Sequence, residues 1–179
     1  MTSTPAPAGP DGQPPEELAE LVRHSLAYKR AEERLEAARV AIQEAIVRHL
    51  RERNARPGRI ADHTPYDRVW ISELGRNAEP PVPPLKGPRA VGPPPTYDPA
   101  VQDAALAELD RLSAAVRRAE ATIERERPVI HAEIIRLYEL GWTAKTLSPH
   151  TPYPPSWVGM IARSGTETRQ RPRGARNSG

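Results

Sequence analysis

The 179-residue sequence contains no cysteine and no phenylalanine, and Lys29, Lys86 and Lys145 are its only lysines beside many arginines. Without cysteine, disulfides and thiolate metal sites are excluded, and a reducing cytoplasm is the natural compartment. No apolar stretch approaches membrane-spanning length, and residues 1–13 lack the apolar run of a leader. We therefore expect a soluble, cytoplasmic protein without membrane contact.

Aromatic residues are also scarce, at 4% of the chain, whereas there are 22 prolines. Burial must therefore come mainly from Leu, Ile, Val and Ala, and such a lean core needs a second segment to cover it. No alternating strand pattern occurs, while apolar residues recur at helical spacing over long stretches. The sequence predicts an all-α fold.

The residue patterns that support catalysis are missing as well. We find no nucleophile with a base, no acid pair with a pocket, no glycine loop for phosphates and no set of metal ligands. His63 and His150 are expected to form turn hydrogen bonds, because no second ligand stands at a metal-binding spacing. An enzyme, a cofactor and a metal are therefore not expected.

The chain contains the same unit twice. A shift of 88 positions aligns Leu18 with Leu106, and a shift of 87 aligns the two His-Thr-Pro-Tyr blocks that begin at His63 and His150. Such a repeat indicates one structural unit used twice. The expected organisation is a disordered N-terminus (1–13), a first copy (14–78), a Pro-rich linker (79–100), a second copy (101–165) and a basic disordered tail (166–179).

Each copy begins with a long amphipathic helix. Pro15 followed by acidic residues predicts the first helix start, and Gly141 predicts the end of the second long helix. Pro128 predicts a kink within it. The narrow apolar stripe, with Arg and Glu on the other faces, is typical of helices that pair with each other, either within one chain or across a homodimer.

Two short helices with a tight turn between them are expected after each long helix. In the first copy Pro57 fits an early helical position, Thr64 fits the N-cap of the next helix and Pro65 its start. Asp67 then stands three residues after that cap, close to a capping-box arrangement. With the end of the long helix, these elements have helix-turn-helix proportions.

The segment from Tyr66 to Arg76, Tyr-Asp-Arg-Val-Trp-Ile-Ser-Glu-Leu-Gly-Arg, resembles the recognition helix of helix-turn-helix DNA-binding domains common in actinobacterial regulators. A Tyr-Ser-Arg-x-x-Val-x-x-Ile-x-Arg pattern recurs in that family, and the likeness covers roughly 20 to 30 residues per copy. The resemblance implies a DNA-facing side formed by Asp67, Arg68, Trp70, Ser72 and Arg76, with Arg59 and Thr64 near phosphates. For Trp70, packing on the long helix is the alternative role.

The second copy departs from this pattern. Pro155 stands where the first copy has Arg68, and Pro154 removes the amide that Thr151 would cap. Pro155 is expected to begin a shorter helix. The candidate DNA contacts that remain in this copy are Lys145, Ser156 and Arg163. The first copy is therefore expected to read DNA, and the second to support it.

These observations favour a binding protein for double-stranded DNA, a transcriptional regulator by analogy, with tandem helix-turn-helix units on paired long helices. The arginines of the tail would bind phosphates without sequence preference. The alternative is a coiled-coil scaffold whose degenerate units dock a protein partner, which Glu73 and Met160 favour. The target sequence, activation or repression, and DNA binding by the second copy stay open.

Overall fold

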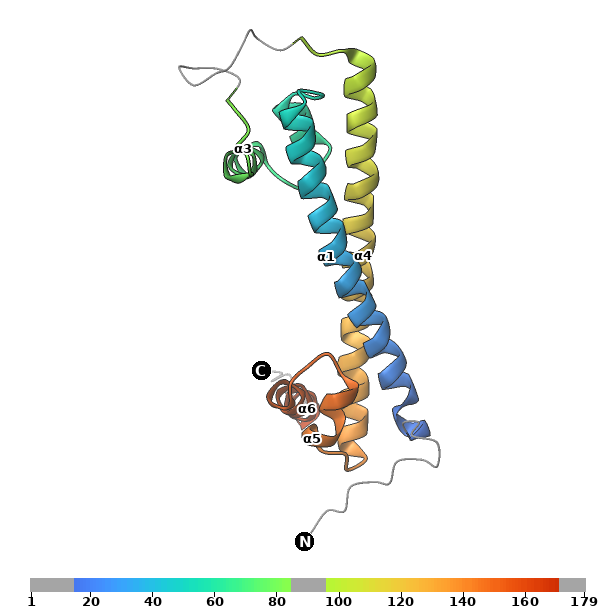
Figure 1. Ribbon diagram of the computed structural model, residues 1–179. Helices are drawn as coiled ribbons and strands as arrows, with labels where there is room; N and C mark the ends of the chain where they lie inside the picture. The colour runs from blue at the N-terminus through green and yellow to red at the C-terminus, as the bar shows by residue number, and fades with distance from the viewer. Residues whose placement is uncertain (1–14, 85–95, 171–179) are drawn as a thin grey trace, which may run out of the picture. The chain divides into compact units, whose positions relative to one another are not determined.

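The computed structural model describes residues 15–84 and 96–170, and this part of the chain is all-helical, without strands. The predicted fold class is confirmed, since short helices follow each long helix (Figure 1). In chain order the elements are η1 (Glu16–Leu18), α1 (Ala19–Arg51), α2 (Pro57–Asp62), α3 (Arg68–Asn77), α4 (Pro99–Glu139), α5 (Ala144–Leu147), η2 (Ser148–His150) and α6 (Pro155–Gln170).

Some sequence expectations lie outside the described residues, namely the state of residues 1–14, of 85–95 in the linker and of 171–179 in the tail. The first residues of the expected tail are described, and they continue α6 to Gln170. None of the helices in the described part of the chain is both long and apolar enough to span a membrane.

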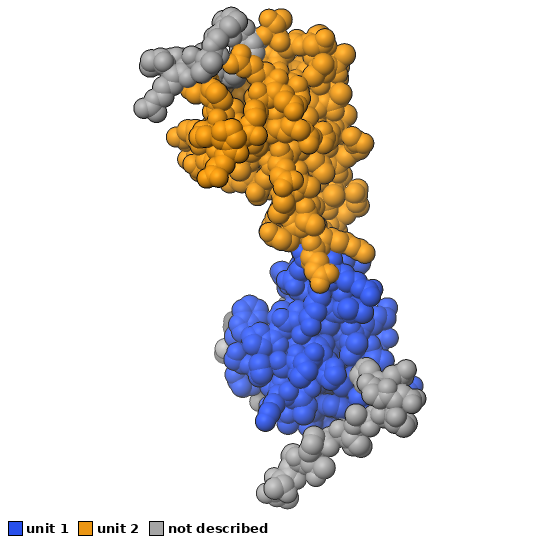
Figure 2. All heavy atoms as spheres, viewed as in Figure 1, with its two compact units in different colours: residues 1–32, 121–179 blue, residues 33–120 orange. Residues whose placement is uncertain are grey.

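The chain divides into two compact units (Figure 2). Unit 1 comprises residues 1–32 and 121–179, and unit 2 comprises residues 33–120. Each unit therefore contains the short helices of one copy, the end of that copy's long helix and the beginning of the other copy's long helix. The short helices of each copy share their unit with long-helix segments from both copies.

In unit 2, α1 and α4 lie side by side and antiparallel, and α3 runs across the direction of α1 (Figure 1). Arg48 donates to Glu108 at 2.6 Å and Arg39 donates to Glu120 at 3.2 Å, which fixes the antiparallel register. The hydrogen bond from Arg48 holds the pKa of the Glu108 carboxyl below its ordinary value. The buried core of unit 2 consists of Ile42, Ala45, Ile46, Leu50, Ala55, Ile60, Ile71, Ala105, Leu106, Leu109 and Val116.

In unit 1, the beginning of α1 is paired with the end of α4. A guanidinium nitrogen of Arg136 donates to the Glu17 carbonyl at 3.0 Å, and His24 Nδ1 lies 2.5 Å from a Glu126 carboxylate oxygen. The large side chains that are fully buried in this unit are Leu18, Leu21, Ile130, Ile134, Leu137, Leu147 and Val158. They come from η1, both long helices, α5 and α6, so unit 1 also has a core of its own.

The buried face of α1 differs in one respect from the apolar stripe in the sequence. Leu26, which continues that stripe, is 45% exposed, whereas Ser25 is buried. The equivalent serine of α4, Ser113, is also buried and donates to the His63 carbonyl at 2.8 Å. A small hydroxyl side chain at this position lets the long helix of unit 2 approach the turn after α2, which a leucine would prevent.

Both long helices end in the same type of turn. After α4, Gly141 has a φ of 95°, and the Trp142 amide donates to the Leu137 carbonyl at 3.1 Å. After α1, Arg53 takes the left-handed conformation with a φ of 57°, and the Asn54 amide donates to the His49 carbonyl at 3.0 Å. These bonds satisfy carbonyls of the last helical turn. The predicted stop at Gly141 is confirmed.

Gly141→Ala is expected to lower the free energy of unfolding by about 1 kcal/mol, because a residue with a Cβ is strained at this φ. Urea denaturation followed by circular dichroism measures the change. Gly58→Ala is the matched control, since Gly58 lies inside α2 and no atom stands within 4 Å of an added Cβ. It should leave stability unchanged or raise it; an equal loss in both variants would contradict the role of the left-handed turn.

The two prolines expected to shape the second copy both lie in helices. α4 runs unbroken through Pro128. α6 begins at Pro155, as the sequence predicts, but it is not shorter than its counterpart, because it has 16 residues and α3 has 10. A Cβ on Gly165 would lie 2.4 Å from the Ile135 side chain, so the missing side chain permits close packing of α6 on α4.

Candidate nucleic-acid interface

α2 and α3 form the expected pair of short helices in unit 2. Pro57 occupies the start of α2, and Ile60 is its fully buried residue. The predicted cap of the next helix is wrong by three residues. Asp67, and not Thr64, is the N-cap of α3, and its carboxylate accepts the Trp70 amide at 2.8 Å. The half-buried Thr64 lies in the turn, with its hydroxyl 3.5 Å from the Tyr66 carbonyl.

Two stacked aromatic rings join the turn before α3 to its first turn. The rings of Tyr66 and Trp70 are 3.9 Å apart and nearly parallel, with an angle of 14° between their planes. Residues 64–66 precede the helix, which begins at Arg68 after the Asp67 cap. Trp70 is half-buried and packs on the core of unit 2. Its contacts are those of a scaffold residue, which is the alternative role stated above.

One edge of α3, next to the buried Ile71, carries Arg68, Ser72 and Arg76. Ile71 is fully buried, whereas these three side chains are exposed. They stand four residues apart and therefore form one stripe, about 12 Å long at 1.5 Å per residue. The Ser72 hydroxyl donates to the Arg68 carbonyl at 2.8 Å, so only the guanidinium groups have strong donors to spare.

The charges around this stripe are mixed. Arg59 is exposed on α2, and the Arg56 guanidinium lies 5.3 Å from the centre of the Tyr97 ring. On α3 itself, Glu73 stands 3.6 Å from Arg76, and both side chains are exposed. At that distance in water the pair is weak. Arg76 can therefore exchange this contact for a phosphate or a carboxylate.

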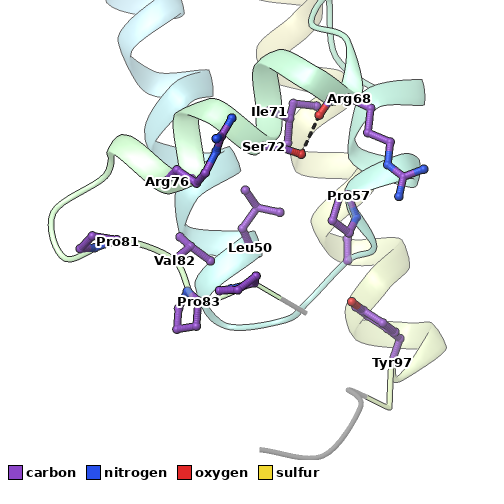
Figure 3. A pocket seen from close by; sticks show the side chains of 13 residues that line it. Leu50, Pro57, Arg68, Ile71, Ser72, Arg76, Pro81, Val82, Pro83 and Tyr97 are labelled. Atoms are coloured by element: carbon purple, nitrogen blue, oxygen red, sulfur yellow. Dashed lines mark hydrogen bonds between the residues drawn. The ribbon is translucent and has the colours of Figure 1, made fainter. Parts of the chain in front are cut away.

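The arginine stripe also borders a pocket of about 690 Å3 (Figure 3). Its far wall is residues 80–84, which we call the proline strap. The Val82 amide donates to the Gly75 carbonyl at 2.9 Å, and Arg51 donates to the Pro80 carbonyl at 2.8 Å. The Leu50 side chain, from α1, lies between α3 and the strap, beside Val82 of the strap (Figure 3). The lining consists of Leu50, Ala55, Pro57, Arg68, Ile71, Ser72, Gly75, Arg76, Pro81, Val82, Pro83, Pro84 and Tyr97.

Sequence reasoning placed the three polar lining residues on one face but missed the strap. The strap lies in the Pro-rich stretch that reads as a linker, and Val82 stands there between prolines. Its anchoring bond runs to Gly75, where a Cβ would come within 3.3 Å of Leu50. The available sequence signal for the strap was a glycine, Gly75, with a valine, Val82, beyond the following turn. Such a pair shows no helical or strand periodicity.

In unit 1, α5 and α6 take the places of α2 and α3. Thr143 caps α5 in a capping box with Thr146. Thr151 does not cap α6, because its hydroxyl is buried in the preceding turn and bonds Ser148 and Tyr153. The three candidates for DNA contact in this unit are all exposed: Lys145 on α5, and Ser156 and Arg163 on α6.

The outer face of α6 is more apolar than that of α3. Trp157 is 52% exposed and Met160 is 50% exposed, one helical turn apart. The ring of Tyr153 packs against Tyr28 and His131, and it stacks on Trp157 at 5.8 Å, less closely than Tyr66 stacks on Trp70. Burial raises the pKa of the Tyr153 hydroxyl and lowers the pKa of the His131 imidazole. The aromatic residues of the two copies are thus in register but differently used.

Of the histidines in the two repeated blocks, His63 lies in a turn and His150 ends the 3-10 helix η2. His63 Nδ1 is 3.1 Å from the Asp110 carboxylate on α4. Within residues 15–84 and 96–170, no three His, Cys, Asp or Glu side chains come together as metal ligands.

No protein-family model, curated protein or solved structure matches this chain. Comparison with other proteins therefore assigns neither a family nor a function.

Proposed function

We propose that this chain binds double-stranded DNA, with α3 as the helix that enters the major groove. The observation that carries the proposal is the exposed stripe of Arg68, Ser72 and Arg76 on a short helix fixed crosswise at the end of a long one. A helix of this kind fits the width of the major groove, and arginine is the commonest side chain that reads guanine there.

The fixed position of α3 supports this proposal. Ile71 and Ile60 are fully buried in one core with α1 and α4, so the stripe is presented on a rigid support. The Asp67 carboxylate caps the helix, and its negative charge is partly compensated by the positive end of the helix dipole. Arg59 on α2 is exposed and suited to a phosphate contact.

Unit 1 has a different role in this proposal. Its α6 presents Met160 where α3 has Glu73, and it exposes Trp157, the equivalent of Trp70, so it offers few groups that could read bases. Lys145 and Arg163 would contribute phosphate contacts, which position a protein without specifying sequence. A transcriptional regulator is the role that we propose by analogy with other helix-turn-helix proteins.

Arg68→Ala should weaken binding to a selected duplex by about 1–3 kcal/mol if Arg68 reads a base. The duplex is first selected from random sequences by pull-down and sequencing, and affinity is then measured by gel shift over a range of salt concentrations. Affinity of the unaltered chain should fall steeply with salt, because arginines displace counterions from phosphates. Arg117→Ala, on the exposed face of α4, is the control with the same charge change and should leave affinity nearly unchanged.

Absence of salt-dependent binding at low ionic strength would refute DNA binding. In that case the second candidate, a scaffold that docks a protein partner, would gain support from the exposed Trp157 and Met160, since both residue types are enriched at protein interfaces. Equal loss of affinity in Arg68→Ala and Arg117→Ala would instead show that α3 has no special place in the complex.

A further inference from the structure

We propose that the pocket between α3 and the proline strap binds a small amphipathic anion, with its carboxylate at Arg68 and its apolar body against Leu50, Val82 and Tyr97. This would be a ligand site in addition to the DNA surface. The juxtaposition that carries it is an apolar cavity beside two arginines on one helical stripe.

The size and lining of the pocket fit an apolar body. Its volume of about 690 Å3 is within the range of about 300–1,000 Å3 that is usual for sites of small ligands. Leu50 and Ile71 form buried parts of the wall, and the strap opposite them consists mainly of proline rings. The strap is fixed at Val82 and Pro80 by hydrogen bonds to α3 and α1. The cavity is therefore built from anchored segments on both sides.

The charge of the pocket favours an anion. None of its described lining residues is acidic, and two are arginines. Within the described part of the chain, the Arg68 guanidinium has no hydrogen-bond or ion-pair partner, whereas Arg76 has the weak contact to Glu73. A guanidinium can hold a carboxylate through two parallel hydrogen bonds. An anion at Arg68 would thus pair with a cation that has no partner among the described residues.

One consequence rests on the proposed function. Arg68, Ser72 and Arg76 belong both to the pocket rim and to the face of α3 assigned to DNA. An anion held there occupies the same donors, so it should compete with DNA. The pocket would then give the chain a ligand that weakens its hold on DNA, because one side chain cannot serve both partners at once.

Isothermal titration calorimetry of the full chain with decanoate, below the concentration at which micelles form, tests the site without DNA. Saturable binding of decanoate is expected, with weaker binding of 1-decanol, which lacks the charge, and of acetate, which lacks the apolar body. Decanol binding as tightly as decanoate would overturn the assignment of an anion, and absence of saturable decanoate binding would overturn the site itself.

Two variants locate the binding. Arg68→Gln should weaken decanoate binding about tenfold or more, because it removes a charge-assisted hydrogen bond. Ser72→Trp should abolish it, since an indole on this exposed position fills the cavity without entering the core. Arg117→Gln on α4, which does not line the pocket, should bind decanoate as the unaltered chain does. Unchanged affinity in Ser72→Trp, with circular dichroism showing a folded chain, would place decanoate elsewhere and refute the proposal.

The two proposals fail independently. Decanoate binding in the absence of a gel shift would leave the pocket assigned and refute DNA binding. A gel shift without decanoate binding would do the reverse. If both occur, decanoate should lower the affinity for the duplex in proportion to its occupancy, and DNA affinity unaffected by saturating decanoate would refute the competition between them.

Discussion

Ile71→Ala is expected to lower the free energy of unfolding by about 2–5 kcal/mol, the range for truncation of a large aliphatic side chain in a packed core. Ile71 is fully buried and holds α3 against the core of unit 2. Truncation removes apolar surface and leaves a cavity between α3 and the long helices. Urea denaturation followed by far-ultraviolet circular dichroism measures the loss.

Val69→Ala is the matched control on the same helix. Val69 is 68% exposed, so its truncation should change the free energy of unfolding by less than about 0.5 kcal/mol. A loss in Ile71→Ala no larger than that in Val69→Ala would show that α3 is not docked on the core. DNA binding should survive in Ile71→Ala only under conditions in which circular dichroism still shows a folded chain.

The helical framework could be predicted because its signals are periodic and occur twice. The spacing of Ile42 and Ile46 in the first copy, repeated by Ile130 and Ile134 in the second, marks the buried face of each long helix, and all four side chains are fully buried. Gly141 gave the end of α4, because few other residues adopt its φ. Because each pattern occurs in both copies, the second copy supports the prediction made from the first.

The errors in the predicted helix cap and buried face arose where the sequence has no signal that decides between neighbouring residues. Thr64 and Asp67 are both good helix caps, and the sequence alone does not decide between them. In the structure the Asp67 carboxylate accepts the Trp70 amide, and Thr64 lies in the preceding turn. Ser25 was missed for a similar reason, since burial of a small polar residue follows from how closely two helices approach, which has no periodic signal.

Part of the candidate site could also be predicted from the sequence, and part could not. Helical spacing placed Arg68, Ser72 and Arg76 on the largely outward side of the helix, and all three side chains are exposed in the structure. The proline strap could not be predicted, because its position depends on hydrogen bonds from Val82 to Gly75 and from Arg51 to Pro80, which have no periodic signal. The polar lining of the pocket was therefore predictable, whereas the apolar wall formed by the strap was not.

The two units differ in chemistry at one pair of positions on the long helices. A second large effect on stability is expected there. In unit 1, His24 Nδ1 and a Glu126 carboxylate oxygen are 2.5 Å apart, and the Glu126 side chain is only 7% exposed. The shift that aligns the two copies places Leu112 and Ala38 at the equivalent positions, and both are partly buried apolar residues of unit 2. The chain therefore contains its own apolar version of the pair.

His24→Leu is expected to lower the free energy of unfolding by about 3 kcal/mol at neutral pH, because it leaves a buried carboxylate without its partner. The loss should lie at the low end for such pairs, since Arg125 still bonds Glu126 at 2.9 Å. The double variant His24→Leu with Glu126→Ala, which copies Leu112 and Ala38, should recover most of the loss, since replacing a buried pair by apolar residues is often neutral. Urea denaturation of the three proteins gives the comparison.

The stability of the same variants should also respond differently to acid. The hydrogen bond from His24 holds the pKa of Glu126 below its ordinary value of 4.5, so the unfolded chain takes up the proton more readily. Stability from this carboxylate is therefore fully present above pH 4.5 and is lost as the pH falls through the lower pKa of the folded state. The double variant should lack this part of the acid sensitivity. An equal loss of stability in acid with and without the pair would show that Glu126 does not contribute through its charge.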